Sequence, residues 1–433
     1  MLPFPESVDV LVVGAGPAGA VAASILARKG FQVLVVERLA FPRHVIGESL
    51  LPRCLDLLGE AGLLGAVERR GYEVKHGATF VRAGKTQRFA FRDNLPGDAA
   101  YAYQVPRDDF DQTLATAAFA AGADVRFGAG VRSVTMREEG SATMADVVLF
   151  DEHTEREVNV SARFVLDASG PARVLAKAFG LEEPSDILAR TAMYTHVEGD
   201  RRPSDDTAGD IFITLHPAGA WLWIIPFSNG RTSVGVVAEP HLFEGRGSPA
   251  ERFWELVRGE PAAAERLGRA RQALPIQVLR GWSTRTRRLS GKGYAIAGNA
   301  GDFLDPVFSS GVMFALESGS LAAHLAAREL ASEPVDWEVE YEGVLKQAVD
   351  VFRVFVKAWY AGELPDLFFF DKKPMTAIRH ITSILGGNVR NRHNPFVSND
   401  ARGELDRMLA AVRHEEARAA KGRTREHETT KAT

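Results

Sequence analysis

Apolar and polar residues follow two different periods along the first forty positions. Val8 to Val13 is an almost continuous apolar run rich in β-branched residues, which predicts a strand buried on both faces of a parallel sheet. An alanine-rich helical pattern follows over 20–29 and ends at Gly30, a residue type favoured just beyond a helix. Residues 31–37 repeat the buried-strand pattern. The segment therefore predicts a β-α-β unit.

Later segments alternate between apolar and polar residues in the way of half-buried strands. Residues 77–81 and 86–91 flank the turn Ala83-Gly84-Lys85, which predicts an antiparallel hairpin. Residues 190–240 hold more short strands broken by glycine and asparagine, so we expect the two separated β-rich segments to form one second sheet. A short strand at 294–298 and a helix at 311–330 follow, and from Asp336 onward helical patterns dominate.

Composition excludes several classes of protein. The 433 residues are 45% hydrophobic and 25% charged, ordinary values for a globular chain that can bury a large core. The formal net charge of −4 leaves no overall basic field, so we predict no nucleic-acid partner. The single cysteine, Cys54, cannot form an internal disulfide, and we predict no metal site. Glycine and proline break the uncharged stretch 10–27, and no basic region with an apolar run begins the chain, so we expect a cytoplasmic protein without a membrane span.

A glycine-rich motif stands between the first predicted strand and helix. Its sequence is Gly14-Ala15-Gly16-Pro17-Ala18-Gly19, and Glu37 ends the second strand. In this context Gly14 permits a tight turn, Gly16 lets the backbone approach a pyrophosphate, and Gly19 lets the helix pack on the sheet. Glu37, with Arg38 beside it, would contact the adenosine ribose. The motif predicts a dinucleotide site with its phosphates at residues 14–19.

Three further motifs resemble those of FAD-binding oxidoreductases and occur in the expected order. They are Gly47-Glu48-Ser49-Leu50-Leu51-Pro52, Asp167-Ala168-Ser169-Gly170 and Gly298-Asn299-Ala300-Gly301-Asp302. Over about the first 330 residues the chain resembles the superfamily of hydroxybenzoate hydroxylase and geranylgeranyl reductase. The resemblance implies FAD as the cofactor and an α/β (α+β) fold, with an FAD-binding Rossmann-like domain, an inserted antiparallel β-sheet substrate domain and a C-terminal helical region.

The same resemblance implies which further residues contact FAD. Asp302 would bind the ribityl chain, and Arg107 would reach the flavin, with Arg43 as a second candidate of the same kind. Either arginine could instead be a surface salt-bridge partner. Val131 would contact the adenine through its backbone. The remaining expected contacts are Ser49, Gly311 and Val312.

These motifs imply a division of the chain. The FAD-binding parts would cover 1–75, 107–189 and 291–333, and the substrate sheet would cover 76–106 and 190–290. The C-terminal helical region would cover 334–412. Residues 413–433 are charged, rich in alanine and threonine and without an apolar period, which predicts a disordered tail.

Two motifs resemble the signatures of flavin-dependent halogenases. Residues 221–226 match Trp-x-Trp-x-Ile-Pro, and residues 303–311 match Phe-x-x-Pro-x-x-Ser-x-Gly. The matching positions are Trp221, Trp223, Ile225 and Pro226 in the first motif and Phe303, Pro306, Ser309 and Gly311 in the second. Strand alternation puts both tryptophans and the isoleucine on one face, although buried aromatic residues usually serve as core. The resemblance implies that the backbone amides of Ser310 and Gly311 hold chloride at a helix N-terminus.

Lys75 stands just before the predicted hairpin, in Glu73-Val74-Lys75-His76-Gly77-Ala78. A lone lysine is normally a solvated surface residue. Phenol and pyrrole halogenases carry their essential lysine in such a Lys-x-Gly-Ala setting, so the resemblance implies that Lys75 receives the oxidised halogen and presents it to an electron-rich ring. An ammonium suits this role because its pKa responds to burial. Glu48 would orient Lys75 or take the ring proton, unless it merely belongs to the flavin-binding loop.

The resemblance implies a halogenase that uses reduced FAD, oxygen and chloride or bromide in natural-product biosynthesis, antibiotics included. The two tryptophans would keep the aromatic substrate away from the flavin. Tryptophan-type halogenases carry a glutamate just before the serine of the second signature, and Phe308 stands there in this chain, which favours a phenol or pyrrole, free or bound to a carrier protein. The sequence has no second Gly-x-Gly-x-x-Gly after a strand, which agrees with a separate flavin reductase as the source of reduced FAD.

Other functions remain open at this point. The same fold serves aromatic monooxygenases and geranylgeranyl-reductase-like enzymes, and a flavin-binding protein can also act as a non-catalytic partner in a biosynthetic complex. The aromatic segments 352–359 and 367–370 could close over the active site, contact a substrate carrier or pack as core, and core packing is the default.

Overall fold

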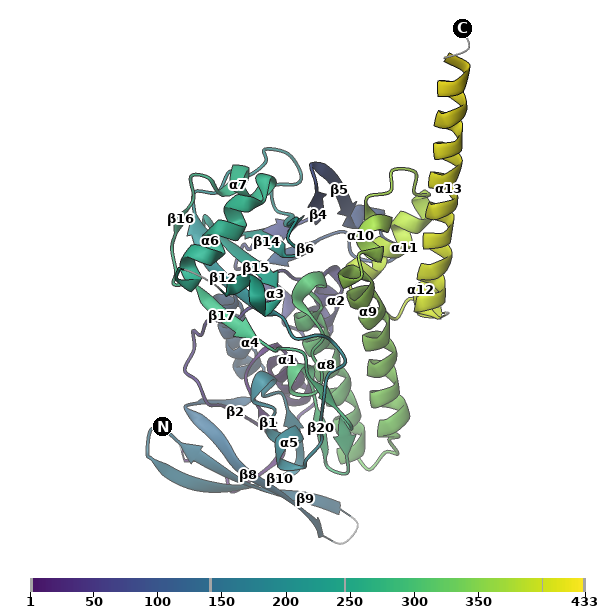
Figure 1. Cartoon of the computed structure of the whole chain (residues 1–433). Helices are drawn as coiled ribbons and strands as arrows, with labels where there is room; N and C mark the ends of the chain where they lie inside the picture. Colours follow the sequence, from purple (N-terminus) through teal and green to yellow (C-terminus); the bar gives the residue numbers. More distant parts are fainter. Residues whose placement is uncertain (1–2, 140–141, 245–246, 399, 431–433) are drawn as a thin grey trace.

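Two main sheets occupy different halves of the molecule (Figure 1). The computed structural model describes residues 3–139, 142–244, 247–398 and 400–430. The first sheet has the strand order β19-β20-β10-β1-β2-β7, and all neighbours from β20 to β7 run parallel. Its strands are β1 (Ser7–Val13), β2 (Val33–Glu37), β7 (Asp124–Phe127), β10 (Arg156–Asp167), β19 (Ser290–Gly291) and β20 (Tyr294–Ile296).

The first sheet is covered on both faces. Along β1, Val10 and Val12 join one apolar cluster while Leu11 and Val13 join another, so the predicted two-sided burial is confirmed. The helices α1 (Pro17–Arg28), α4 (Arg107–Ala120) and α8 (Ser310–Leu330) cover one face. The other face packs on the hairpin of β8 (Ala129–Glu139) and β9 (Ala142–Asp151), which continues antiparallel from β10, and on α5 (Val174–Ala178).

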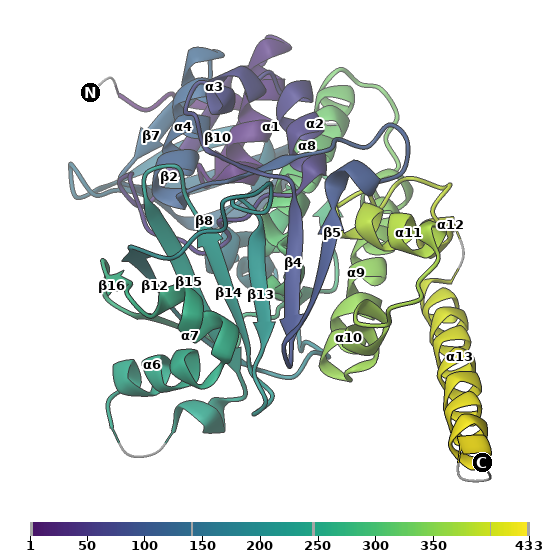
Figure 2. The ribbon, with the colours of Figure 1, turned by 90° about the horizontal axis from the view of Figure 1, so that it is seen from above.

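The second sheet combines the two separated β-rich segments, as predicted. Its order is β16-β12-β15-β14-β13-β4-β5, with β17 also paired to β12. The strands are β4 (Gly77–Arg82), β5 (Lys85–Ala90), β12 (Thr191–Glu198), β13 (Ile211–Leu215), β14 (Trp221–Pro226), β15 (Arg231–Ala238), β16 (Arg271–Gln272) and β17 (Gln277–Arg280). The helices α6 (Pro249–Gly259) and α7 (Pro261–Leu267) cover its outer face (Figure 2).

One pairing in the second sheet differs from the antiparallel prediction. β4 and β5 form the expected hairpin, but β13 runs parallel to β4, with Ile211 opposite Ala78. The sheet is therefore mixed. The reason is that a long crossover, and not a tight turn, connects these two strands, and only hairpin connections require antiparallel neighbours.

Short elements join the two halves. β3 (Glu73–Lys75) pairs antiparallel with β6 (Ala102–Gln104) and leads directly into β4. Other short elements are α2 (Pro52–Glu60), α3 (Leu64–Glu68), β11 (Glu182–Glu183), β18 (Arg285–Thr286) and the 3-10 turns η1 (Phe91–Asp93), η2 (Gly170–Ala172), η3 (Pro240–Phe243), η4 (Gly298–Ala300) and η5 (Pro306–Phe308).

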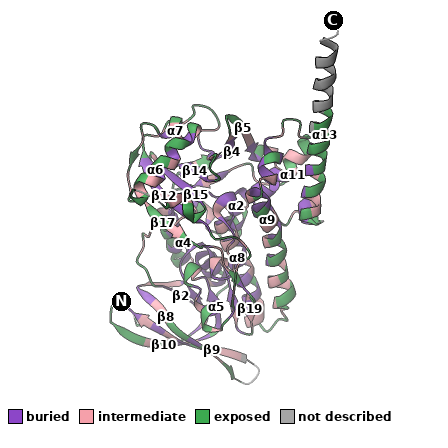
Figure 3. Ribbon diagram, in the orientation of Figure 1, coloured by how far each residue is buried: buried purple, intermediate pink, exposed green. Residues whose placement is uncertain are grey.

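The C-terminal region is helical, as predicted. It comprises the π-helical turn η6 (Glu338–Gly343), α9 (Val344–Tyr360), α10 (Glu363–Phe368), α11 (Met375–Leu385), α12 (Pro395–Ser398) and α13 (Ala401–Thr430). Phe352, Phe355, Trp359 and Phe368 are buried in the same apolar cluster as α1 and α8, so these aromatic side chains pack as core. Figure 3 shows exposed residues along the outer side of α9.

The segment from Arg413 differs from the predicted disordered tail. α13 continues as helix through it to Thr430 and projects from the body (Figure 1), while 431–433 lie outside the described residues. Alanine, glutamate, arginine and lysine all favour helix, and an ion pair of 3.2 Å joins Glu415 to Arg418 one turn on. A low apolar content therefore does not exclude helix.

Candidate active site

Backbone crowding makes glycine necessary in the turn after β1. Gly14 has φ +101°, and a Cβ there would lie 2.4 Å from the carbonyl oxygen of Ala168. A Cβ on Gly19 would lie 1.9 Å from the carbonyl oxygen of Gly14. These contacts close the loop tightly against the ends of β1 and β10, as the sequence pattern predicts.

The loop presents donors that suit a pyrophosphate. α1 starts at Pro17, and no side chain among the described residues caps its N-terminus at Gly16. The Arg43 guanidinium lies over this loop, because a Cβ on Gly16 would be 3.3 Å from Arg43 Nη2. Arg43 Nε is buried and finds no hydrogen-bond partner within the described parts of the chain. The Arg43 guanidinium is also paired through Nη2 with Asp111 at 3.5 Å and Glu37 at 3.9 Å. Uncapped helix amides and the unpartnered Nε of Arg43 fit the phosphates of FAD.

The adenosine end of the site forms beside β2. Glu37 accepts hydrogen bonds from the amides of Ala15 (3.1 Å) and Leu39 (3.0 Å), so its carboxylate is fixed next to the glycine loop. The side chain of Arg38 packs over Gly130, the residue before Val131 on β8. The fold thus places Glu37, Arg38 and Val131 in one neighbourhood.

A buried arginine anchors the Gly-Glu-Ser loop. Arg107 donates to both carboxylate oxygens of Asp111, at 2.8 and 3.0 Å, and to the carbonyl oxygen of Ile46 at 2.8 Å. A Cβ on Gly47 would lie 2.9 Å from Arg107 Nη1. Sequence reasoning missed Asp111, although its place one helical turn after Arg107 in α4 was a usable signal.

Asp302 occupies the turn after β20, where the third FAD motif predicts it. Its Oδ1 accepts a hydrogen bond of 2.8 Å from the amide of Thr286, and burial raises the pKa of Asp302.

Lys75 is buried, with 1% of its surface exposed. Nζ donates to Ser49 Oγ and to the carbonyl oxygen of Leu50, both at 2.9 Å, and lies 5.2 Å from the centre of the Phe91 ring. Burial lowers the pKa of Lys75 to about 7. A substantial fraction of the side chain is therefore a neutral amine at neutral pH, which has the lone pair that an electrophilic halogen requires.

Glu48 pairs with His196, whereas the sequence predicted that Glu48 would orient Lys75. Glu48 Oε1 lies 2.8 Å from His196 Nε2, and both side chains are almost fully buried. Glu48 and Ser49 point to opposite sides because the backbone is extended here, with Ser49 bridged to Gln104. Sequence reasoning missed His196, which sits in β12 without a motif of its own.

The Gly-Glu-Ser motif and the two halogenase signatures meet at one small cavity. Its lining residues are Ile46, Gly47, Glu48, Ser49, Ile211, Trp221, Trp223, Ile225, Pro306 and Ser309. Among these described lining residues, Glu48 is the one ionisable side chain. Lys75 lies behind Ser49. The space measures about 30 Å³, enough for a water but not for an aromatic ring.

The two signature tryptophans form a rigid wall. Trp223 lies across Gly235 of β15, where a Cβ would be 2.1 Å from the indole, and donates to Ser233 Oγ at 3.1 Å. Trp221 donates to the Tyr360 hydroxyl at 3.1 Å. Both indoles and Ile225 face the cavity, which confirms that they share one face of β14.

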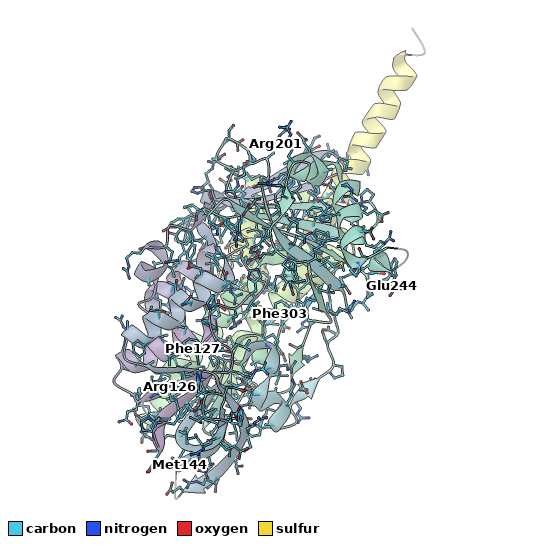
Figure 4. The ribbon with its side chains drawn as sticks, turned by 90° about the vertical axis from the view of Figure 1, so that its left-hand side faces the viewer. Arg126, Phe127, Met144, Arg201, Glu244 and Phe303 are labelled. Atoms are coloured by element: carbon cyan, nitrogen blue, oxygen red, sulfur yellow. The ribbon has the colours of Figure 1, made fainter. Side chains whose placement is uncertain are left out.

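The second halogenase signature forms the turn into α8. Ser309 has φ +56°, and α8 begins at Ser310, again without a side-chain cap in the described structure. The Phe303 ring covers Gly311, since a Cβ there would lie 2.9 Å from Phe303 Cε2. Figure 4 shows Phe303 between the half that carries Phe127 and the half that carries Arg201. The turn therefore lies at the junction of the two halves, with the free amides of a helix N-terminus.

The described residues contain no cluster of histidine, cysteine, aspartate and glutamate able to hold a metal ion. Within the same residues, no helix is long and apolar enough to cross a membrane.

Comparison with known proteins places these features in a family. The model of the FAD binding domain family matches residues 7–326. A 1H-pyrrole-2-carbonyl-(peptidyl-carrier protein) chlorinase of Pseudomonas fluorescens is 28% identical over 81% of this chain and 83% of its own length. The flavin-dependent halogenase ascD of Acremonium egyptiacum is 30% identical over 82% of this chain and 68% of its own length.

Solved structures agree on the fold. A flavoprotein/dehydrogenase from Cytophaga hutchinsonii is 40% identical, with a TM-score of 0.89 over 95% of this chain and 100% of its own. The myxobacterial chondrochloren halogenase CndH, titled a variant of FAD-dependent halogenases, is 28% identical, with a TM-score of 0.73 over 95% of this chain and 96% of its own.

Proposed function

Because this chain belongs to the flavin-dependent halogenases and carries their FAD binding domain, we propose that it halogenates an electron-rich phenol or pyrrole. One observation carries the proposal. Glu48, Ser49 and the two signature tryptophans line the same cavity, and the buried amine of Lys75 is bonded to Ser49 behind that wall.

Lys75 is the residue that we assign to carry the halogen. FAD, when bound and reduced by a separate flavin reductase, supplies the electrons with which oxygen and halide give hypohalous acid. The neutral Lys75 amine attacks the halogen of this acid, so that an N–Cl bond forms, the O–Cl bond breaks, and the oxygen leaves with one amine proton as water. Ser49 Oγ and the carbonyl oxygen of Leu50 hold Nζ in place for this attack.

Glu48 is the residue that we assign to take the ring proton. When a ring carbon attacks the halogen, the N–Cl bond breaks and the C–Cl bond forms. The ring then loses a proton to the Glu48 carboxylate, and an equivalent proton returns to the nitrogen of Lys75. His196, 2.8 Å from Glu48, would donate through Nε2 and so hold the carboxylate in one orientation toward the cavity.

The remaining assignments concern FAD and halide. We assign the pyrophosphate to residues 14–19 and Arg43, the adenosine to Glu37, Arg38 and Val131, and the flavin end to Ser49, Arg107, Asp302, Gly311 and Val312. Halide would bind the amides of Ser310 and Gly311 at the uncapped start of α8, where the helix dipole favours an anion. The two tryptophans would separate the aromatic substrate from the flavin.

Product analysis tests the proposal. The protein would be supplied with FAD, a flavin reductase, NADH and air, together with phenols and pyrroles either free or on a carrier protein, first in chloride and then in bromide. The carrier-bound arm follows from the name of the Pseudomonas chlorinase. We expect a mass increase that follows the salt, is lost in Lys75→Ala and persists in Lys85→Ala, a matched change at a lysine that is 65% exposed. Products without halogen in every arm would overturn the proposal.

A second candidate function is favoured by the 40% identical structure titled flavoprotein/dehydrogenase. In that case a nicotinamide cofactor would reduce bound FAD directly, and the substrate would gain or lose hydrogen. Rapid-mixing measurement of FAD reduction by NADH or NADPH, without a reductase, separates the two. Fast reduction with no halogenated product would select this second function.

A further inference from the structure

The hydroxyl of Tyr360 joins three distant parts of the chain. Tyr360 is the last residue of α9, and its hydroxyl lies 3.1 Å from Trp221 Nε1 and 2.9 Å from Asp305 Oδ2. Trp221 is a wall of the cavity, and Asp305 belongs to the second halogenase signature. The C-terminal helical region therefore touches both signatures through one oxygen atom.

The direction of these hydrogen bonds is fixed by chemistry. An indole N–H can only donate, so the Tyr360 oxygen accepts from Trp221. A hydroxyl has one proton, which must then go to the Asp305 carboxylate. Removing the hydroxyl would leave two buried polar groups without this partner, the indole N–H and Asp305 Oδ2, and each such loss is costly.

Asp305 connects the Tyr360 hydroxyl to the turn before α8. It is 1% exposed, and its other oxygen, Oδ1, accepts the amide of Val307 at 3.0 Å. This bond fixes the turn that places Pro306 and Ser309 in the cavity wall and starts α8 at Ser310.

The ring of Tyr360 is also held. The Arg190 guanidinium lies 3.7 Å from its centre, and Arg190 is itself 3.7 Å from Glu239. Arg190 directly precedes β12, the strand that carries His196. The ring and the hydroxyl are thus fixed by separate partners, which leaves the side chain little freedom to turn away.

We propose that Tyr360 is a positioning residue that holds the turn 305–310 in its halide-binding geometry and thereby sets halide affinity. This inference rests on the proposed function, because it takes the start of α8 as the halide site. In this proposal the C-terminal helices contribute to halide binding as well as to core packing.

The test compares Tyr360→Phe with Tyr341→Phe. Tyr341 is a buried tyrosine of the same C-terminal region whose hydroxyl donates to the carbonyl oxygen of Ile296 at 2.8 Å, away from the cavity. We expect Tyr360→Phe to raise the KM for bromide and for chloride by about fivefold or more while the KM for the aromatic substrate stays within twofold. Calorimetric titration of the FAD-loaded protein with bromide should show the same loss of affinity. Tyr341→Phe should change neither quantity.

Asp305→Ala breaks the same link from its other end, because it removes both the acceptor of the Tyr360 hydroxyl and the acceptor of the Val307 amide. Loss of a negative charge near the halide site would by itself lower the KM for halide, whereas loss of the fixed turn would raise it. A rise therefore supports the positioning role, and a fall overturns it, even where Tyr360→Phe does not yield folded protein. An unchanged halide KM in a folded Tyr360→Phe protein, or an equal rise in the aromatic KM, also overturns it. If the wild type halogenates no substrate, the proposed function is wrong. If the wild type halogenates but the variants leave the KM for halide unchanged, only the positioning role of Tyr360 is wrong.

Discussion

Replacing Lys75 with methionine should make the protein more stable at low pH while it abolishes halogenation. Burial lowers the pKa of Lys75 from 10.5 to about 7. At about 1.4 kcal/mol for each pKa unit, the charged form of the buried side chain costs about 5 kcal/mol of folding free energy. The variant also loses the hydrogen bonds to Ser49 and Leu50, and this loss lowers its gain in folding stability by about 2 kcal/mol. At pH 6 we therefore expect Lys75→Met to be more stable by about 3 kcal/mol.

The sign of this difference depends on pH. Between pH 7 and 10.5 the unfolded chain keeps a proton on Lys75 that the folded chain has lost, so the stability of the wild type rises with pH in this window. Below pH 7 both states are protonated and the full cost is present. The advantage of Lys75→Met should shrink steadily above pH 7 and vanish near pH 9, where the remaining cost of about 2 kcal/mol equals the lost hydrogen bonds.

Urea unfolding at pH 6, 7, 8 and 9, followed by circular dichroism with equal excess FAD, measures the difference directly. Lys85→Met serves as the control, because Lys85 is 65% exposed and its replacement should give no pH-dependent difference. A difference that does not vary with pH, or a Lys75→Met protein less stable than the wild type at pH 6, would refute the reasoning. Either result would mean that Lys75 is charged and well paired in the folded protein.

Three further predictions concern the base, the glycine loop and the C-terminal helix. Glu48→Gln should lower kcat for halogenation by about 100-fold in steady-state kinetics, while the Kd for FAD measured by flavin fluorescence stays within twofold. An unchanged kcat would mean that Glu48 does not take the ring proton. Gly19→Ala forces a Cβ to within 1.9 Å of the Gly14 carbonyl oxygen, so we expect a loss of about 1–3 kcal/mol in urea unfolding and weaker FAD binding; tight FAD binding would contradict this. Ending the chain after Arg413 should leave Tm and activity unchanged, because Val412 is the last residue described as buried, and a fall in Tm of several degrees would show that the removed part packs on the body.

The features that the sequence predicted are mostly local. The β-α-β unit follows from apolar periodicity, and the need for Gly19 follows from backbone crowding within one turn. The alternation of Trp221, Trp223 and Ile225 also depends only on the strand that carries them. Such patterns need no knowledge of the partner segment, which is why they could be read in advance.

The features that it did not predict depend on residues far apart in the chain. Glu48 and His196 are 148 positions apart, and nothing in the local pattern of β12 marks one histidine as the partner of a loop glutamate. Tyr360 meets Asp305 across 55 positions and Trp221 across 139. Lys75 could be identified as a candidate from the motif around it. Its hydrogen bond to Ser49 could not be predicted, because it depends on how the loop 47–52 folds against β3.

The parallel pairing of β4 with β13 imposes an order on synthesis. Ile211 lies opposite Ala78, so β4 leaves the ribosome about 130 residues before its partner exists. At about 5–20 residues per second this edge waits roughly 7–26 seconds with β5 on one side only. During that interval the nascent chain exposes an apolar strand edge beside the segment that carries Lys75, which is the kind of surface that chaperones bind and that aggregation exploits. The pairing that completes the second sheet thus leaves one edge of β4 exposed in the growing chain until β13 has been made.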